Sequence, residues 1–246
     1  MKPYRITAVS YYNTLPFIYG LTHSGLLGNF DLSLDVPSEC ARKIISDEAD
    51  IGLIPVGALP GISDYQLIGN LCIGADKDVK SVLLLANAAF TEIKTIYLDT
   101  DSRTSVNLVK VLARHFWKID PDWKSLAELK GKPGIDEGMV LIGDKTFGLS
   151  NQYPYCYDLA GEWIRFTGLP FVFAVWISRK TLPAEFVKAF QSALAWGVEH
   201  REDSAVVAGK LHISEQELVS YLKNDISYSL DEAKVKGMEL FLKFLS

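Results

Sequence analysis

The chain has 246 residues, of which 48% are hydrophobic and 22% are charged. This length and composition can bury a full core in one large or two small domains, and they exclude disordered, collagen-like and disulfide-stapled proteins. The net charge is −5 and no Lys/Arg run is longer than Arg42-Lys43, so a nucleic-acid partner is not expected. A small anion is compatible with this charge, because a few local donors matter more than the net value.

The cysteines and the apolar segments indicate where the protein works. Cys40, Cys72 and Cys156 form no CxxC pair and no zinc-ligand spacing with histidine, which predicts buried free thiols in a reducing compartment and no metal. Residues 1–5 run straight into a strand pattern without an apolar leader segment. The longest apolar runs, such as residues 171–177, are too short to span a bilayer. These features predict a cytoplasmic protein without a membrane partner.

Strand and helix patterns alternate through the first half of the chain, which predicts an α/β fold with mainly parallel sheets. The predicted strands are residues 4–9, 30–36, 51–54, 67–75 and 79–86. The predicted helices are residues 16–23 and a second helix that follows Pro37, with Ser38 as its N-cap.

A second α/β unit is expected to begin near residue 90. Its predicted strands are residues 96–98, 140–142 and 171–177, and its predicted helices are residues 105–116 and 158–166. The polar stretch 118–137 is predicted to lie on the surface. Beyond residue 177 only helices are expected, the last two opening at the capping boxes Ser214-x-x-Glu217 and Ser229-x-x-Glu232.

Two α/β units without a flexible linker predict two lobes joined by two crossing strands. We expect residues 1–87 and 174–246 to form lobe one and residues 88–173 to form lobe two, with the C-terminal helices completing lobe one. A ligand would then bind between the lobes, which close on it.

The first candidate binding loop is Ser10-Tyr11-Tyr12-Asn13-Thr14, between the first strand and the first helix. It combines hydroxyls, an amide and aromatic rings at a helix N-terminus, where free backbone N–H groups attract anions. The alternative is that Asn13 or Thr14 caps the helix while the tyrosines pack.

The second candidate loop leads into the predicted helix of lobe two. Its hydroxyls and one guanidinium suit a carboxylate or a phosphate, and the residues concerned are Ser102, Arg103, Thr104 and Ser105. A capped helix needs only one such hydroxyl, which favours binding. The alternative for Arg103 is a surface ion pair with Asp99 or Asp101.

Two further positions are weaker candidates. Gly143 allows close approach of backbone, and Asp144 is expected either to receive a ligand hydroxyl or to hold Arg103, although a plain turn explains both equally well. Ser81 precedes a predicted crossing strand and is expected to face the cleft. The four histidines show no metal or triad spacing, and the chain contains no dinucleotide, nucleotide, zincin or hydrolase motif, so no cofactor is predicted.

Several of these strings together resemble the chorismate dehydratases of the futalosine route to menaquinone, over roughly residues 4–180. The strings occur in order as Ser10-Tyr11-Tyr12-Asn13-Thr14-Leu15-Pro16-Phe17, Val36-Pro37-Ser38, Asp50-Ile51-Gly52-Leu53-Ile54-Pro55-Val56, Lys80-Ser81-Val82-Leu83-Leu84, Asp101-Ser102-Arg103-Thr104-Ser105, Leu141-Ile142-Gly143-Asp144 and Tyr157-Asp158-Leu159. The resemblance implies a two-lobed type II periplasmic-binding-protein fold. Tyr12 and the segment Lys145-Thr146-Phe147 depart from the family pattern, so the cleft wall near Phe147 is expected to differ.

The resemblance also implies a reaction: chorismate, a dicarboxylate, loses water and becomes 3-[(1-carboxyvinyl)oxy]benzoate. Asn13 and Ser81 would act on the hydroxyl or the enolpyruvyl group, while the hydroxyls and Arg103 of the second loop would hold a carboxylate. Either the substrate's own enolpyruvyl carboxylate or Glu39 would take the proton. The rivals are a non-catalytic cytosolic sensor of a small acid and the sister enzyme 1,4-dihydroxy-6-naphthoate synthase, whose Ser-Pro-Cys-Pro-Asn-Asp-Thr opening this chain lacks. The oligomeric state stays open.

Overall fold

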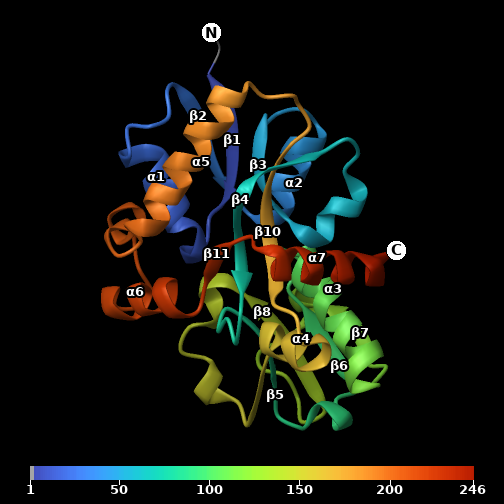
Figure 1. The fold of residues 1–246 in the computed structure, drawn as a ribbon. Coiled ribbons are helices and arrows are strands. Elements are labelled where there is room, and N and C mark those ends of the chain that lie inside the picture. The colour runs from blue at the N-terminus through green and yellow to red at the C-terminus, as the bar shows by residue number, and fades with distance from the viewer. Residues whose placement is uncertain (1–2) are drawn as a thin grey trace.

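The computed structural model describes residues 3–246, so Met1 and Lys2, on which part of the expected N-terminal start depends, lie outside the described residues. The chain folds into two lobes, each built around one sheet, which lie one above the other in Figure 1. Helices cover the faces of both sheets. The α/β class and the two-lobed layout expected from the sequence are confirmed.

The sheet of lobe one has six strands in the order β11-β4-β10-β3-β1-β2. Their bounds are Tyr4–Val9 (β1), Phe30–Asp35 (β2), Ile51–Pro55 (β3), Gln66–Ala75 (β4), Phe171–Ser178 (β10) and Ser227–Ser229 (β11). The first three run parallel to one another, whereas β10, β4 and β11 pair in antiparallel fashion. The carboxyl ends of the three parallel strands therefore lie at the same edge of the sheet, which is where α/β proteins bind their ligands.

The sheet of lobe two has five strands in the order β7-β6-β8-β5-β9. Their bounds are Val82–Ala86 (β5), Thr95–Leu98 (β6), Asp122–Ser125 (β7), Glu137–Ile142 (β8) and Tyr155–Asp158 (β9). The strand β6 is parallel to β7 and β8, whereas β5 is antiparallel to β8 and β9.

Both sheets are therefore mixed, and the expectation of mainly parallel sheets was wrong in this respect. The reason is that a strand returning from the other lobe enters each sheet in the opposite direction. Since β5 pairs within the second sheet, the first crossing falls between β4 and β5 rather than after residue 87. We propose residues 76–81 and the start of β10 as the hinge between the lobes.

Seven α-helices within residues 3–246 complete the lobes. Their bounds are Leu15–His23 (α1), Pro37–Ile45 (α2), Arg103–Val111 (α3), Leu159–Thr167 (α4), Ala184–Glu199 (α5), Glu215–Asn224 (α6) and Glu232–Leu245 (α7). The helices α1 and α5 pack so closely that a Cβ atom at Gly197 would overlap the carbonyl oxygen of Pro16. The helix α3 continues into a π-helical segment, Leu112–Trp117.

The helix starts were predicted with mixed success. Ser214 caps α6 as expected, because its Oγ accepts the N–H of Glu217. The expected caps Ser38 and Ser229 were wrong: the N-cap of α2 is Val36, and α7 is capped by Asp231, whose carboxylate accepts the N–H of Lys234. Short strands such as β9 and β11 were missed, since three or four residues carry too weak an alternation to detect.

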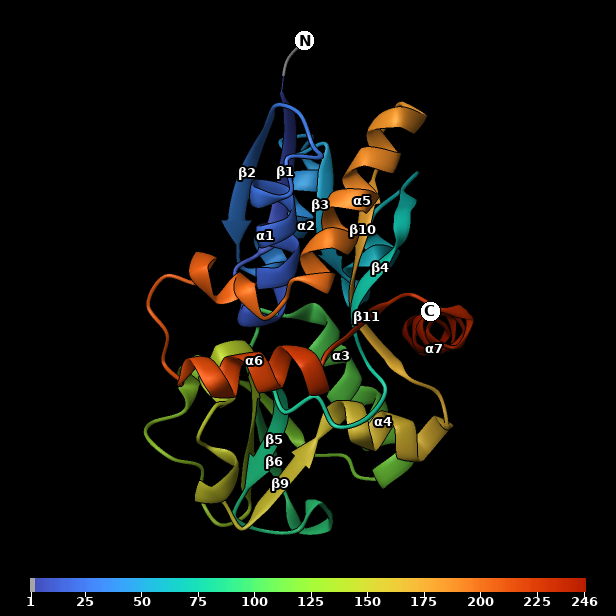
Figure 2. The same ribbon diagram turned by 60° about the vertical axis from the view of Figure 1, so that its left-hand side comes forward.

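The C-terminal helices touch both lobes, so they do more than complete lobe one. The ring of Phe241 on α7 packs on Trp163 of α4 and on Phe171 of β10, with centroid distances of 5.8 and 5.1 Å. Figure 2 shows α6 and α7 at the level where the two lobes meet, with α6 on one side and α7 on the other. Within residues 3–246, no helix combines the length and apolar character that crossing a membrane requires.

Candidate active site

A cavity lies between the two lobes and takes its walls from both. Its lining residues are Val9, Tyr11, Asn13, Pro37, Pro55, Ile73, Ser81, Val82, Ser102, Ser105, Ile142, Gly143, Phe173 and Ala174. The loops that follow the parallel strands β1 and β3 supply one side, and the start of α3 with the end of β8 supplies the other. The position matches the rule that α/β sheets bind ligands at the carboxyl ends of their strands.

Six of the residues singled out in the sequence lie together on this cavity: Tyr11, Asn13, Ser81, Ser102, Ser105 and Gly143. The hydroxyls of Ser102 and Ser105 are buried at the first turn of α3 and lie 3.2 Å apart. The Oγ of Ser102 also accepts the Ser105 N–H at 3.3 Å, which makes Ser102 the N-cap of the helix. A helix start with two hydroxyls suits a carboxylate.

Five candidates lie outside the lining: Ser10, Thr14, Arg103, Thr104 and Asp144. The Thr104 hydroxyl donates to the carbonyl of Phe173 at 3.1 Å and accepts the N–H of Gly57 at 2.9 Å, so it ties α3 to lobe one. Arg103 is exposed at the start of α3, and Ser10 is exposed at the end of β1. Thr104 therefore serves the contact between lobes, and Arg103 is exposed and does not line the cavity.

Asn13 and Ser81 are held by two buried tyrosines from the C-terminal segment. The Tyr221 hydroxyl donates to Ser81 Oγ at 2.8 Å, and the Tyr228 hydroxyl donates to the main-chain carbonyl of Asn13 at 3.0 Å. The Thr14 hydroxyl donates to Asn13 Oδ1 at 3.2 Å. Sequence reasoning missed both tyrosines, because nothing local connects them with partners so far away along the chain.

Gly143 of lobe two and Tyr11 of lobe one lie against each other in the wall of the cavity. Gly143 has φ +63°, and a Cβ atom there would come within 2.8 Å of the Tyr11 ring, so this position requires glycine. The Tyr11 hydroxyl is buried and has no hydrogen-bond partner among residues 3–246. Burial, reinforced by the charges of Asp101 and Asp99, raises the pKa of this phenol well above its usual value. The Tyr11 hydroxyl is therefore a protonated donor that no described residue satisfies.

Asp144 holds the two lobes together. Its Oδ1 accepts the N–H of Tyr12 at 3.0 Å. Asp144 is not among the residues that line the cavity, and its only hydrogen-bond partner within residues 3–246 is Tyr12 rather than Arg103. The neighbouring Phe147 ring lies 5.9 Å from the Tyr12 ring and 5.0 Å from the Tyr221 ring, measured between centroids. The residues that depart from the family pattern, Tyr12 and Phe147, thus pack on each other. Burial raises the pKa of Asp144 to about 6, against the opposing effect of the Tyr12 N–H.

We expect Asp144→Asn to stabilise the protein at about pH 8 and to leave its stability nearly unchanged at about pH 4. The Asp144 carboxyl ionises near pH 3.8 in the unfolded chain but only near pH 6 in the folded protein. The folded wild type therefore loses stability as the pH rises from about 4 through 6, because the buried carboxyl then becomes charged. Asparagine does not ionise but keeps an oxygen for the Tyr12 N–H. Linkage puts the gain in unfolding free energy at about 3 kcal/mol. Urea unfolding at both pH values measures it, and a variant that loses stability at about pH 8 would contradict the assignment.

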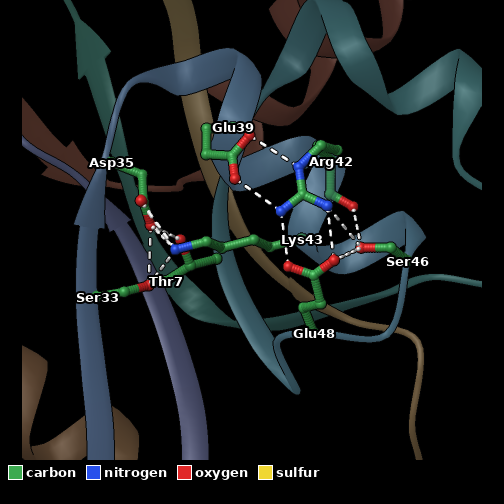
Figure 3. Close-up of polar contacts among 8 residues, drawn as sticks. All are labelled: Thr7, Ser33, Asp35, Glu39, Arg42, Lys43, Ser46 and Glu48. Atoms are coloured by element: carbon green, nitrogen blue, oxygen red, sulfur yellow. Dashed lines mark hydrogen bonds and ion pairs between the residues drawn. The ribbon is translucent and has the colours of Figure 1, made fainter.

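Glu39, the protein base considered from the sequence, is engaged elsewhere. Figure 3 shows the Arg42 guanidinium between the carboxylates of Glu39 and Glu48, with closest distances of 2.7 and 2.6 Å. The hydrogen bond with Arg42 lowers the pKa of Glu39. On the same helix, Lys43 Nζ lies 2.7 Å from an oxygen of Asp35 and ties α2 to β2. Glu39 does not line the cavity, and its lowered pKa makes it a poorer base.

Comparison with known proteins agrees with this architecture. A family model described as menaquinone biosynthesis matches residues 4–246. A chorismate dehydratase from Thermus thermophilus is 28% identical over 100% of this chain and 96% of its own length, and one from Campylobacter jejuni is 29% identical over 74% and 71%. The Candida albicans CA3427 gene product, described as having the generic periplasmic binding protein structural fold, aligns with TM-score 0.69 and 11% identity over 99% of this chain and 90% of that one. The chain has this two-lobed fold and belongs to the menaquinone biosynthesis family.

Proposed function

We propose that the protein is a chorismate dehydratase, which converts chorismate to 3-[(1-carboxyvinyl)oxy]benzoate and water in menaquinone biosynthesis. Its membership of the family and the names of the two curated relatives support this reaction. The observation that carries the proposal is the inter-lobe cavity, where Asn13 and Ser81 meet the hydroxyl-bearing start of α3. Neutral donors at a helix N-terminus suit a substrate with two carboxylates.

The cavity offers different chemistry to the two ends of such a substrate. At one end, Ser102 and Ser105 with the free N–H groups of the first turn of α3 would bind one carboxylate. At the other end, Asn13 and Ser81 would bind the C4 hydroxyl and the enolpyruvyl group. The ring would lie against an apolar wall that includes Phe173. Holding both ends fixes one reactive conformer and excludes water.

The proton at C3 needs an acceptor, and the described lining residues include no carboxylate, imidazole or amine. We therefore assign this role to the enolpyruvyl carboxylate of the substrate, oriented by the Asn13 amide. The C3–H electron pair becomes the C3–C4 double bond that completes the aromatic ring. The C4–O bond breaks, its electrons leave with the oxygen, and hydrogen bonding from Ser81 stabilises that oxygen. The proton that the enolpyruvyl carboxylate took from C3 then passes to this oxygen and makes it water, which restores the carboxylate. Aromatisation supplies the driving force.

The proposal is tested by mixing the purified protein with chorismate without added metal or cofactor and following products by mass spectrometry. A product lighter by one water, with a benzoate ultraviolet spectrum, is the expected result. Unchanged chorismate bound tightly would instead indicate a sensor of small acids. Unchanged chorismate without binding, together with formation of 1,4-dihydroxy-6-naphthoate from its own precursor, would indicate the sister activity.

Glu39→Gln is expected to keep kcat within about twofold of the wild type. The carboxylate lies outside the cavity lining and is bound by Arg42, so it has no route to the C3 proton. Steady-state assays of chorismate turnover with the variant measure this. Loss of turnover with unchanged chorismate affinity would identify Glu39 as the base and rule out proton transfer to the substrate's own carboxylate.

We also propose that the protein works in the cytoplasm. Cys40, Cys72 and Cys156 are all free thiols, and Cys156 is exposed. An exposed free thiol is typical of a reducing compartment. The cysteines therefore favour a site of action where chorismate is made and used.

A further inference from the structure

We propose that Tyr221 is a positioning residue that orients the Ser81 hydroxyl toward the substrate; the inference rests on the proposed function. Tyr221 lies on α6, is 3% exposed, and its hydroxyl is 2.8 Å from Ser81 Oγ. Ser81 is 2% exposed and lines the cavity, whereas Tyr221 lies behind it and does not. Tyr221 therefore acts on Ser81 rather than on the substrate.

The hydrogen bond decides which way the serine proton points. A serine hydroxyl has one proton to donate and two lone pairs to accept with. The Tyr221 O–H donates to Ser81 Oγ and occupies one lone pair, which leaves the Ser81 proton free to point into the cavity. Burial raises the pKa of Tyr221 well above its usual value, so the phenol stays a neutral donor. In this arrangement Ser81 donates a hydrogen bond to the departing C4 oxygen.

The surroundings hold Tyr221 in this geometry. Its ring meets the Phe147 ring edge to face, with centroids 5.0 Å apart and an interplanar angle of 88°. One turn further along α6, the Asp225 carboxylate lies 2.9 Å from the Nζ of Lys80, the residue before Ser81. Figure 2 shows α6 at the level where the two lobes meet, on one side of the molecule. The ion pair of Asp225 with Lys80 links the end of α6 to the residue before Ser81.

The experiment is a double-mutant cycle of Tyr221→Phe and Ser81→Ala in chorismate turnover. The phenylalanine ring keeps the contact with Phe147 and removes only the hydroxyl. The value of one hydrogen bond predicts that Tyr221→Phe lowers kcat about tenfold and leaves KM within about twofold. In the Ser81→Ala background, Tyr221→Phe is expected to cause no further loss, because the hydroxyl that it orients is already absent.

Tyr97→Phe is the matched control. Tyr97 is a buried tyrosine of β6 whose hydroxyl donates to Glu137 at 3.0 Å, away from the cavity, and its loss is expected to leave kcat unchanged. Wild-type turnover by Tyr221→Phe, or an equal loss in both backgrounds, would overturn the positioning role while leaving the proposed function intact. A wild-type protein that leaves chorismate unchanged would overturn the proposed function and this inference with it.

Discussion

Ser81→Ala is expected to lower kcat for chorismate dehydration about a hundredfold. Removing one preorganised donor from a site where charge develops costs about 10²- to 10³-fold. The Ser81 hydroxyl is such a donor, because it is buried, lines the cavity and is fixed by Tyr221. Its main-chain carbonyl accepts the N–H of Gly143 at 2.8 Å, and alanine keeps that bond. The loss is therefore expected in kcat and not in the shape of the cavity.

Steady-state kinetics and unfolding measurements together test this expectation. Ser204→Ala is a suitable control: Ser204 is fully buried and its hydroxyl donates to the Arg201 carbonyl at 2.7 Å, in a segment that does not line the cavity. It is expected to lose about 1 kcal/mol of stability but no activity. A Ser81→Ala protein with kcat within about threefold of the wild type would show that Ser81 does not act on the departing oxygen.

The two lobes and the loops that line the cavity could be predicted because they depend on local patterns. Alternating strand and helix signals indicated α/β units, and the loops after strands indicated where a ligand binds. Such local patterns do not determine whether two neighbouring strands pair in parallel or antiparallel fashion. The strand β5 pairs with β8 and β9 in antiparallel fashion because the chain enters lobe two from the hinge, and its uniformly apolar residues are compatible with either direction.

Within the second candidate loop, helix geometry separates the residues that line the cavity from those that do not. Ser102 and Ser105 are three positions apart and so share one face at the start of α3. Arg103 and Thr104 lie between them and point in other directions. The composition of the loop singled out a segment that lines the cavity, but which of its residues do so depends on how α3 packs against lobe one through Thr104.

At about pH 8, Asp158→Asn is expected to lower the free energy of unfolding by about 1–2 kcal/mol and to reduce kcat as well. Burial raises the pKa of Asp158 to about 6, as it does for Asp144, but this carboxylate accepts four N–H groups rather than one, and the loss of those bonds outweighs the relief of the buried charge. Asp158 is 8% exposed, and its carboxylate joins two segments. Oδ2 accepts the N–H groups of Val79 and Lys80 at 2.9 and 2.6 Å, and Oδ1 accepts those of Ala160 and Gly161 at 3.0 and 3.1 Å. Asparagine has one acceptor oxygen, so its NH₂ group would face one pair of donors. Two buried N–H groups would then lose their partner, at about 1–3 kcal/mol each.

Asp158→Asn is expected to lower kcat because Val79 and Lys80, whose N–H groups Asp158 accepts, directly precede Ser81. Lys80 has φ +63°, a left-handed conformation that costs a lysine about 1–2 kcal/mol and persists here because its N–H is bound by Asp158. Urea unfolding and kcat are measured on Asp158→Asn and on Asp136→Asn, a control that removes one partner of an exposed ion pair with Lys94. The control is expected to stay within about 0.5 kcal/mol of the wild type. An Asp158→Asn protein that unfolds like the control would mean that the carboxylate does not hold the hinge. Loss of stability with full kcat would mean that the hinge anchor does not position Ser81.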